Sequence, residues 1–284
     1  MTELRYVYAV CDRLDAPLAA DLTGVGGDPP HLISHVGLTA VVGHVPAEQF
    51  SERALRRNLE DLDWLSGTAR AHQAVIASLI SVTSPLPLRL ATVFHDDSGV
   101  RTMLEEEGER FRASLERLRD RVEWGVKVSV EAPSSTGGGD APSRASGPSN
   151  GGRRERPSPT SLASGSGRDY LRRRRAERTD RDDAWRQAET VAQSLHDELA
   201  RRADDNRIHP PQNSELSRAS GRNVLNSAYL VRRSEAESFV ERVKLSAERA
   251  PELRVELTGP WAAYSFSTPP QERSDAQQTA GETR

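Results

Sequence analysis

The chain has a single cysteine, Cys11, among its 284 residues. One thiol cannot form an intramolecular disulfide, and its isolation excludes a metal centre built from several cysteines. Because Cys11 closes an apolar run, we interpret it as a small buried hydrophobe rather than a reactive thiol. No stretch approaches the roughly 20 apolar residues that cross a bilayer. The first residues also lack the basic start and apolar centre of a signal peptide. We therefore expect a cytosolic protein that does not enter a membrane.

Lysine is almost absent, with Lys127 and Lys244 as the two examples, so arginine carries nearly all of the positive charge. The 39 basic and 42 acidic residues leave a formal net charge of −3. A balance this close to neutrality predicts neither strong attraction of nucleic acid nor an acidic, solvating chain. With 36 % apolar residues, a chain of this length favours two domains, provided that part of it stays outside any core.

The common catalytic and cofactor motifs are also missing: there is no P-loop, no HExxH, no EF-hand loop and no CxxC. His31 and His35 are four residues apart, but Pro30 and the strand that follows argue against a helix presenting both to a metal. The best catalytic candidate is His95-Asp96-Asp97, where a carboxylate would orient a histidine base. A polar turn explains the same residues, and we favour it. His72 lies on an apolar helical stripe, so we interpret it as a core histidine with satisfied hydrogen bonds. We expect no enzyme activity, no cofactor and no metal.

The first 131 residues alternate between strand and helix patterns. An apolar run at Leu4–Val10 predicts a strand covered on both faces, and alternation predicts a second strand from Val36 to Val45. From Ser51 to Ile80, apolar residues recur every three or four positions, which predicts one helix, or two helices broken near Ser66-Gly67. A second helical stripe and a half-buried strand complete this part, the helix marked by Leu104, Phe111, Leu115 and Leu118 and the strand by Val122–Val130.

Residues 132–166 have a different composition, dominated by Ser, Gly, Pro, Ala and Arg. Such a segment cannot bury enough surface to offset its ordering entropy, so we predict a flexible linker. Beyond it the patterns predict a long helix, an irregular polar segment at 204–222, a strand at Asn223–Val231, a helix and a last strand from Leu253. The fold class is therefore α+β: a mixed α/β domain at 1–131 and a ferredoxin-like domain at 167–267. The polar residues 268–284 are expected to form a disordered tail.

The second half opens with a basic run, Arg172-Arg173-Arg174-Arg175. Acidic residues follow at once, among them Glu177 and Asp180, which favours a helix surface covered with ion pairs. The alternative is an arginine-rich nucleic-acid-binding module, whose affinity would fall steeply with salt. We expect no nucleic-acid partner.

Five segments, in order along the chain, carry a family resemblance. They are Pro87-Leu88-Arg89-Leu90-Ala91-Thr92-Val93-Phe94, Glu123-Trp124-Gly125-Val126-Lys127-Val128, the Tyr170-Leu171 entry to the basic helix, Leu225-Asn226-Ser227-Ala228-Tyr229-Leu230-Val231, and Gly259-Pro260-Trp261-Ala262-Ala263-Tyr264-Ser265-Phe266. Together they resemble the signature of the GvpF/GvpL family of gas vesicle proteins. Two departures stand out: Ala91 replaces a frequent glycine, and Ala262-Ala263 replace two prolines.

The resemblance implies an accessory protein of gas vesicles, the gas-filled protein shells that give bacteria and archaea buoyancy. It implies a location at the vesicle or in the cytoplasm, and a modified ferredoxin-like second domain. It also implies binding to the hydrophobic shell protein GvpA and to other gas vesicle accessory proteins during assembly. Neither enzyme activity nor a cofactor is implied.

The motifs also supply candidate contact residues, for each of which packing in a core or a turn remains an open alternative: Arg89, Thr92, Phe94, Trp124, Lys127, Tyr229, Trp261 and Tyr264. We expect Leu86–Phe94 to run extended between two helices and the strand that carries Trp124. Arg89 is the single charge in this segment, and we expect it to form an ion pair within the domain.

Overall fold

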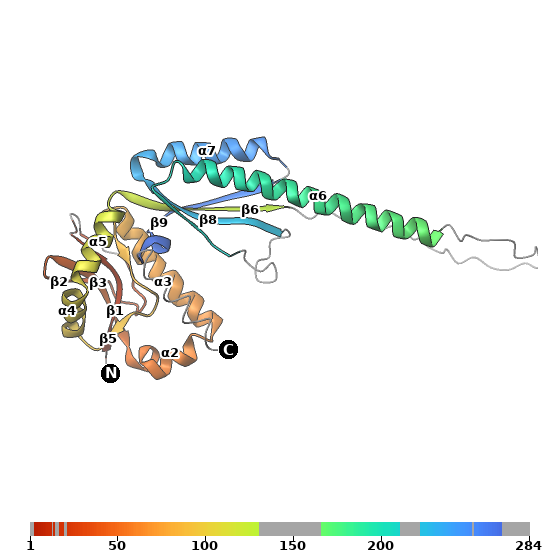
Figure 1. Ribbon diagram of the computed structural model, residues 1–284. Helices are drawn as coiled ribbons and strands as arrows, with labels where there is room; N and C mark the ends of the chain where they lie inside the picture. The colour runs from red at the N-terminus through yellow and green to blue at the C-terminus, as the bar shows by residue number, and fades with distance from the viewer. Residues whose placement is uncertain are drawn as a thin grey trace, which may run out of the picture.

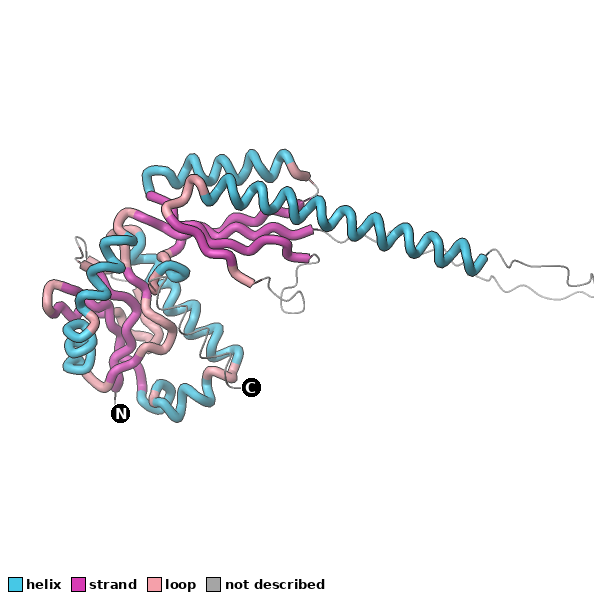
Figure 2. The backbone as a smooth tube through the Cα atoms, viewed as in Figure 1, coloured by secondary structure: helices cyan, strands magenta, loops and turns pink. Residues whose placement is uncertain are grey.

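A computed structural model describes residues 3–12, 14, 17–19, 22–130, 166–210, 222–251 and 253–268. The predicted linker at 132–166 lies outside the described residues except for its last position, where a helix begins. The predicted tail lies outside them beyond Thr268. Two antiparallel sheets organise the rest of the chain, each with helices packed on it (Figures 1 and 2).

The first sheet has the strand order β2-β3-β1-β4, and β5 also pairs with β1. Its strands are β1 (Glu3–Cys11), β2 (His31–His35), β3 (Leu38–Pro46), β4 (Leu86–Pro87) and β5 (Val93–Phe94). Tyr6 and Tyr8 of β1 share a buried cluster with α3 (Leu62–Ile80), whereas Val7 and Val10 belong to a cluster on the other face. The prediction of a strand covered on both faces is confirmed, and Cys11 is fully buried.

The strand predicted from Val36 to about Val45 corresponds to β3, but its first two residues belong to a hairpin turn, and the partner strand β2 was not predicted. Val36 and Gly37 make the turn between β2 and β3, with φ of 46° and 76°. Left-handed conformations at both central residues match the right-handed twist of the paired strands. Gly37 was the visible signal for this turn, and the apolar Val36 obscured it.

The helices of the first half are shorter than predicted. Between Ser51 and Ile80 the break falls at Leu59–Asp61 rather than at Ser66-Gly67, and it separates α2 (Glu52–Asn58) from α3; α1 (Ala47–Phe50) precedes both. The Asp61 carboxylate caps α3 by accepting from the backbone N–H groups of Asp63 and Trp64 at 3.0 and 3.2 Å. The next helical stripe is likewise divided, into α4 (Asp97–Glu106) and α5 (Gly108–Leu118). Its four marker residues are all buried, as predicted.

The second sheet is ferredoxin-like. Along the chain come β6 (Arg121–Val130), α6 (Ser166–Ala200), β7 (Asp205–Ile208), β8 (Arg222–Arg232), α7 (Ala236–Arg249) and β9 (Leu253–Trp261). The spatial order β7-β8-β6-β9 and the β-α-β-β-α-β sequence define this fold. Both helices lie over one face of the sheet (Figure 1). Short 3-10 turns complete the unit, η1 (Arg233–Glu235) and η2 (Tyr264–Phe266).

Two predictions about this half require correction. The strand β7 was missed because its sequence, three polar residues followed by Ile208, shows no local strand pattern and depends on pairing with β8. The strand β6 was assigned to the first domain, 1–131, but it pairs with β8 and β9 in the second sheet. The boundary between the two sheets therefore falls before Arg121 and not at residue 131.

The helix α6 is 35 residues long and extends beyond the sheet and beyond α7 (Figure 1). Its last turns bury Ala188, Ala192 and Leu199 against the sheet. In the described part of its first half, which contains the basic run, the side chains are exposed. Asp183 and Arg186 form an ion pair of 2.5 Å further along. That the basic run forms an ion-paired helix surface and does not bind nucleic acid stays a prediction.

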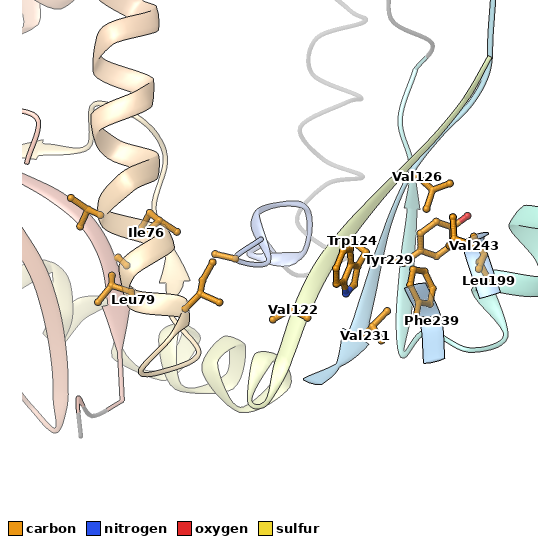
Figure 3. Close-up of a cluster of buried hydrophobic side chains, with 14 of the residues drawn as sticks. Ile76, Leu79, Val122, Trp124, Val126, Leu199, Tyr229, Val231, Phe239 and Val243 are labelled. Carbon is orange, nitrogen blue, oxygen red and sulfur yellow. The ribbon is translucent and has the colours of Figure 1, made fainter. Parts of the chain in front are cut away.

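One buried cluster connects the two halves of the molecule. It contains Ile76 and Leu79 of α3 together with Val122 of β6, and continues to Tyr229 and Phe239 in the second unit (Figure 3). Continuity of the core means that the two sheets cannot separate without exposing apolar surface to water.

Candidate functional site

The segment Leu86–Phe94 forms an edge of the first sheet that is interrupted by a turn. At its two ends, Pro87 pairs with Ala9 and Val93 with Tyr6, both on β1. In the middle the chain leaves the sheet: the backbone N–H and the hydroxyl of Thr92 both donate to the Arg89 carbonyl, at 3.2 and 2.8 Å. The expectation that this segment runs extended beside the strand carrying Trp124 is therefore wrong. Its partner is β1, because the edge of that strand is open to pairing along 5–10.

Ala91 occupies the strained position of this turn. Its φ is 61°, in the left-handed region that favours glycine. The backbone N–H of Ala91 donates to the Tyr6 hydroxyl at 3.1 Å, which ties the turn to the core of the first domain. The frequent glycine of the resembling family motif has its physical explanation in this backbone geometry.

A groove of about 390 Å³ opens between this turn and the helices α4 and α5. Its lining combines apolar side chains with polar and charged ones; the lining residues include Leu86, Leu88, Arg89, Thr92, Phe94, Met103, Glu107, Arg110, Phe111 and Ser267. We call this cavity the motif groove. Three of the predicted contact residues, Arg89, Thr92 and Phe94, are brought together in it.

Arg89 does not behave as predicted. Its side chain is exposed, and within the described residues no ion pair to it is found. The nearby acid Glu107 is bonded to Arg110, one turn along the helix. The expectation of an ion pair inside the domain is wrong for this part of the chain, because the turn directs the arginine away from the core. A cation at the rim of an apolar groove suits a ligand that combines apolar and acidic groups.

Tyr264 belongs to a buried hydrogen-bond chain between the two halves of the molecule. The His72 ring is 3 % exposed; its Nδ1 lies 2.9 Å from the Tyr6 hydroxyl and its Nε2 lies 2.9 Å from the Tyr264 hydroxyl. A neutral imidazole has one donor and one acceptor nitrogen, so one of the two tyrosine hydroxyls donates to the ring and the other accepts from it. Burial lowers the pKa of His72 to about 4 and raises the pKa of Tyr264. The interpretation of His72 as a satisfied core histidine is confirmed.

Neighbours of Tyr264 fix the same segment to other elements. The Glu123 carboxylate on β6 accepts from the backbone N–H of Ser265 at 2.8 Å and from its hydroxyl at 2.7 Å. Phe266 is fully buried, and its carbonyl accepts from Arg117 on α5. The sequence predicted that one face of β6 would be exposed to solvent. Glu123 on that face is only 9 % exposed, so the prediction does not hold at this residue. Figure 1 shows η2, in blue, between α3 and the second sheet. We call the segment Tyr264–Phe266 the closing clasp.

The other predicted candidates lie away from the groove. Tyr229 is fully buried and bonds to His196 Nδ1 at 2.8 Å, and Trp124 is 9 % exposed, so both are core residues. Lys127 is half-buried within the second sheet, opposite Asn226 and Glu256. Trp261 is 40 % exposed at the end of β9. These residues form no common site with Arg89.

The sequence analysis missed several groove residues. Phe111 was recognised only as an apolar position of a helix, and Met103 was not singled out. Both line the motif groove. The helical stripe marks them as apolar, but it carries no information about which cavity they line. Ser267 joins the groove because the closing clasp positions the end of the second unit beside the first.

The turn at His95-Asp96-Asp97 has a structural role. The Asp96 carboxylate caps α4 by accepting from the backbone N–H of Gly99 at 3.0 Å, and hydrogen bonds from Ser98 and Gly99 lower its pKa. Asp97 forms an ion pair of 2.6 Å with Arg5. His95 is exposed. These contacts are those of a structural turn, the interpretation that the sequence favoured; the absence of catalysis at this turn stays a prediction.

A second hollow lies where the two units meet, and it is polar. Arg119 pairs there with Asp12 at 3.3 Å and Glu116 at 2.7 Å, and Arg233 donates to the carbonyl of Ile80 at the end of α3 at 2.7 Å. Since these cations are engaged within the chain, the motif groove is the stronger candidate site. In the described residues no cluster of three or more potential metal ligands occurs. No described helix is both long and apolar enough to span a bilayer.

These features define a class: a two-unit α/β protein with a groove on one unit and a clasp that joins the units. The chain belongs to the gas vesicle synthesis protein GvpL/GvpF family, whose model matches residues 4–268. It is 48 % identical to gas vesicle protein L of Streptomyces sp. (strain CB03234), over 98 % of both chains. It is 31 % identical to gas vesicle protein F of the same strain, over 44 % of this chain and 48 % of that one. The family resemblance stated from the motifs is confirmed.

Solved structures share the fold. The crystal structure of the gas vesicle protein GvpF from Anabaena sp. PCC7120 superposes with a TM-score of 0.61 at 18 % identity, covering 94 % of this chain and 97 % of that one. GvpF from Microcystis aeruginosa gives 0.60 at 16 % identity, with 95 % and 100 % coverage. The α+β fold class with two sheets is therefore shown.

Proposed function

We propose that this protein is a non-enzymatic assembly factor of gas vesicles that binds the hydrophobic shell protein GvpA through the motif groove. It acts at the vesicle or in the surrounding cytoplasm, together with other gas vesicle accessory proteins. Membership of the family supports the accessory role. The observation that carries the finer proposal is that the family's most recognisable motif lines a groove that has both apolar and charged side chains.

The chemistry of the groove suits an apolar segment with an acidic group. Leu88 and Phe94 are half-buried and offer apolar surface, whereas Met103 and Phe111 line the groove but are buried; Arg89 is exposed. A volume of about 390 Å³ accommodates a few side chains rather than a whole helix. Burying two or three leucine-sized side chains contributes roughly 4–8 kcal/mol before the costs of association. Binding of this strength is reversible, as an assembly factor requires if it is to release its shell subunit.

A charge reversal tests the proposal on the full chain. Arg89→Glu places an acid at the groove rim, and we expect a loss of GvpA binding of tenfold or more in a pull-down or by surface plasmon resonance. The matched control is Arg249→Glu, an exposed arginine at the end of α7, which should bind as the wild type does. Equal binding by both variants and the wild type would remove the motif groove from the interface. Absence of GvpA binding by the wild type would refute the proposal as a whole.

A further inference from the structure

The strand β9 forms one edge of the second sheet. It is nine residues long and pairs with β6 along one side. Among the described residues, no other strand pairs with its outer side. An unpaired edge of this length is a template on which another strand can add by main-chain hydrogen bonds. The occupant that this edge can accept is therefore an extended segment of another chain.

The side chains of β9 alternate between the core and the solvent. Leu253 is buried, and Val255 and Leu257 pack against the same cluster, which connects the sheet to α7. Arg254 and Glu256 point to the opposite face, where their side chains are 54 % and 39 % exposed and form an ion pair of 2.9 Å with each other. The exposed face of this edge thus carries one positive and one negative charge, two positions apart.

We propose that two copies of this chain associate through β9, which joins their second sheets into one continuous antiparallel sheet. With a two-fold axis at Val255, Arg254 of each copy lies opposite Glu256 of the other, and Leu253 lies opposite Leu257. Residues directly opposite on one face of an antiparallel pair have Cβ atoms about 5 Å apart, close enough for ion pairs. Moving the axis by one residue, to Arg254 or to Glu256, would place two like charges opposite each other. The charges of this edge therefore complement a second copy of the same edge, and they favour one register.

This arrangement keeps the first units of the two copies apart. The chain leaves β9 at Trp261 and enters the closing clasp, so the first unit lies at that end of the strand (Figure 1). An axis at Val255 therefore places the two first units at opposite ends of the joint sheet. Because the paired segment 253–257 is short, the interface is small, and we expect reversible association that depends on protein concentration.

Charge reversals test this register by sedimentation equilibrium of the full chain at low ionic strength, where surface charges are least screened. Arg254→Glu sets acids opposite acids at both pairs, and Glu256→Arg sets cations opposite cations. We expect the dimer dissociation constant of each variant alone to rise at least tenfold. An equimolar mixture of the two variants restores opposite charges at both pairs, so it should form heterodimers about as tightly as the wild type dimerises. The matched control is Arg249→Glu, an exposed arginine on α7, which should dimerise as the wild type does.

Cysteine crosslinking tests the same register without relying on charge. Because the one natural cysteine, Cys11, is fully buried, engineered thiols react on a clean background. A mixture of Arg254→Cys and Glu256→Cys places the two thiols directly opposite each other. We expect the mixed disulfide to form at least tenfold faster than in a mixture of Arg254→Cys with Glu248→Cys, which is exposed on α7. If a charge-reversed variant fails to fold, these two rates decide the question.

Each result bears on the proposal. A wild type that stays monomeric at every concentration would overturn it, and so would a dimer that both charge reversals leave intact. Variants that remain monomeric when mixed, or equal crosslinking rates for the two mixtures, would overturn the register. The inference goes beyond the proposed function and needs no GvpA. Failure of the dimer therefore leaves GvpA binding untouched, and absence of GvpA binding leaves the dimer standing.

Discussion

Acidification should destabilise this protein through His72. The ring is buried without a nearby acid among its hydrogen-bond partners, which are the hydroxyls of Tyr6 and Tyr264. Burial lowers its pKa from 6.5 to about 4 in the folded state, whereas the unfolded chain titrates near 6.5. The folded state therefore resists protonation more than the unfolded state does. The stabilisation is fully present above pH 6.5 and is lost as the pH falls toward 4.

The size of the effect follows from the two pKa values. A difference of about 2.5 in pKa corresponds to about 3 kcal/mol when both limits are reached. Between pH 7 and pH 5 the expected loss is about 2 kcal/mol, a large part of the 5–15 kcal/mol that stabilises a typical domain. Protonation would also make both ring nitrogens donors, so that both tyrosine hydroxyls would have to accept from His72. The closing clasp should weaken first.

Urea unfolding followed by tryptophan fluorescence at pH 7, 6 and 5 measures this loss. His72→Gln keeps a donor and an acceptor but does not titrate, so the difference between wild type and variant isolates His72 from His31, whose pKa is also lowered by burial. We expect the wild type to lose about 2 kcal/mol more than His72→Gln over this range. His95→Gln, at an exposed histidine, should follow the wild type. A difference between wild type and His72→Gln that is constant with pH would refute the reasoning.

Three further substitutions test the backbone and the clasp by the same unfolding assay. Ala91→Gly removes a left-handed alanine and should stabilise the chain by about 1 kcal/mol; a loss of stability would contradict the role assigned to φ. At Gly259, with φ of 128°, an added Cβ would lie 2.9 Å from the Glu123 carbonyl oxygen and 3.0 Å from the Trp124 ring, so Gly259→Ala should destabilise by roughly 2 kcal/mol or more. Unchanged stability there would mean that the loop relaxes freely. Tyr264→Phe leaves His72 Nε2 without its hydrogen-bond partner and should cost about 1–2 kcal/mol; no loss in Tyr264→Phe would show that the bond contributes nothing.

Local patterns in the sequence were sufficient for much of the fold. The apolar run of β1, the alternation in β6 and β8, and the helical stripes of α3, α5 and α7 all correspond to observed elements. Where the prediction went wrong, the missing information was non-local. The alternation in Arg121–Val130 shows that it is a strand but not which sheet it joins, and the choice depends on pairing with β8 about 100 positions later.

The groove was predictable only in part, for the same reason. Arg89, Thr92 and Phe94 were named because one motif contains them, and the fold places all three in a single cavity. The opposite wall comes from α4 and α5, whose sequence pattern reports burial alone. The charge of Arg89 was also misread, because a single cation in an apolar segment suggests a buried pair until the turn at Ala91 is known.

The two most recognisable motifs of the chain meet at one point of the structure, although about 170 residues separate them. Ala91 of the first motif donates to Tyr6, Tyr6 bonds to His72, and His72 bonds to Tyr264 of the closing motif. The turn that shapes the motif groove and the clasp that joins the two units therefore share one buried hydrogen-bond chain. Ser267, Arg89 and Thr92 all line the groove, so we expect a movement at the clasp to change the shape of the groove. By thermodynamic reciprocity, a ligand that prefers one shape of the groove must favour one arrangement of the two units to the same extent.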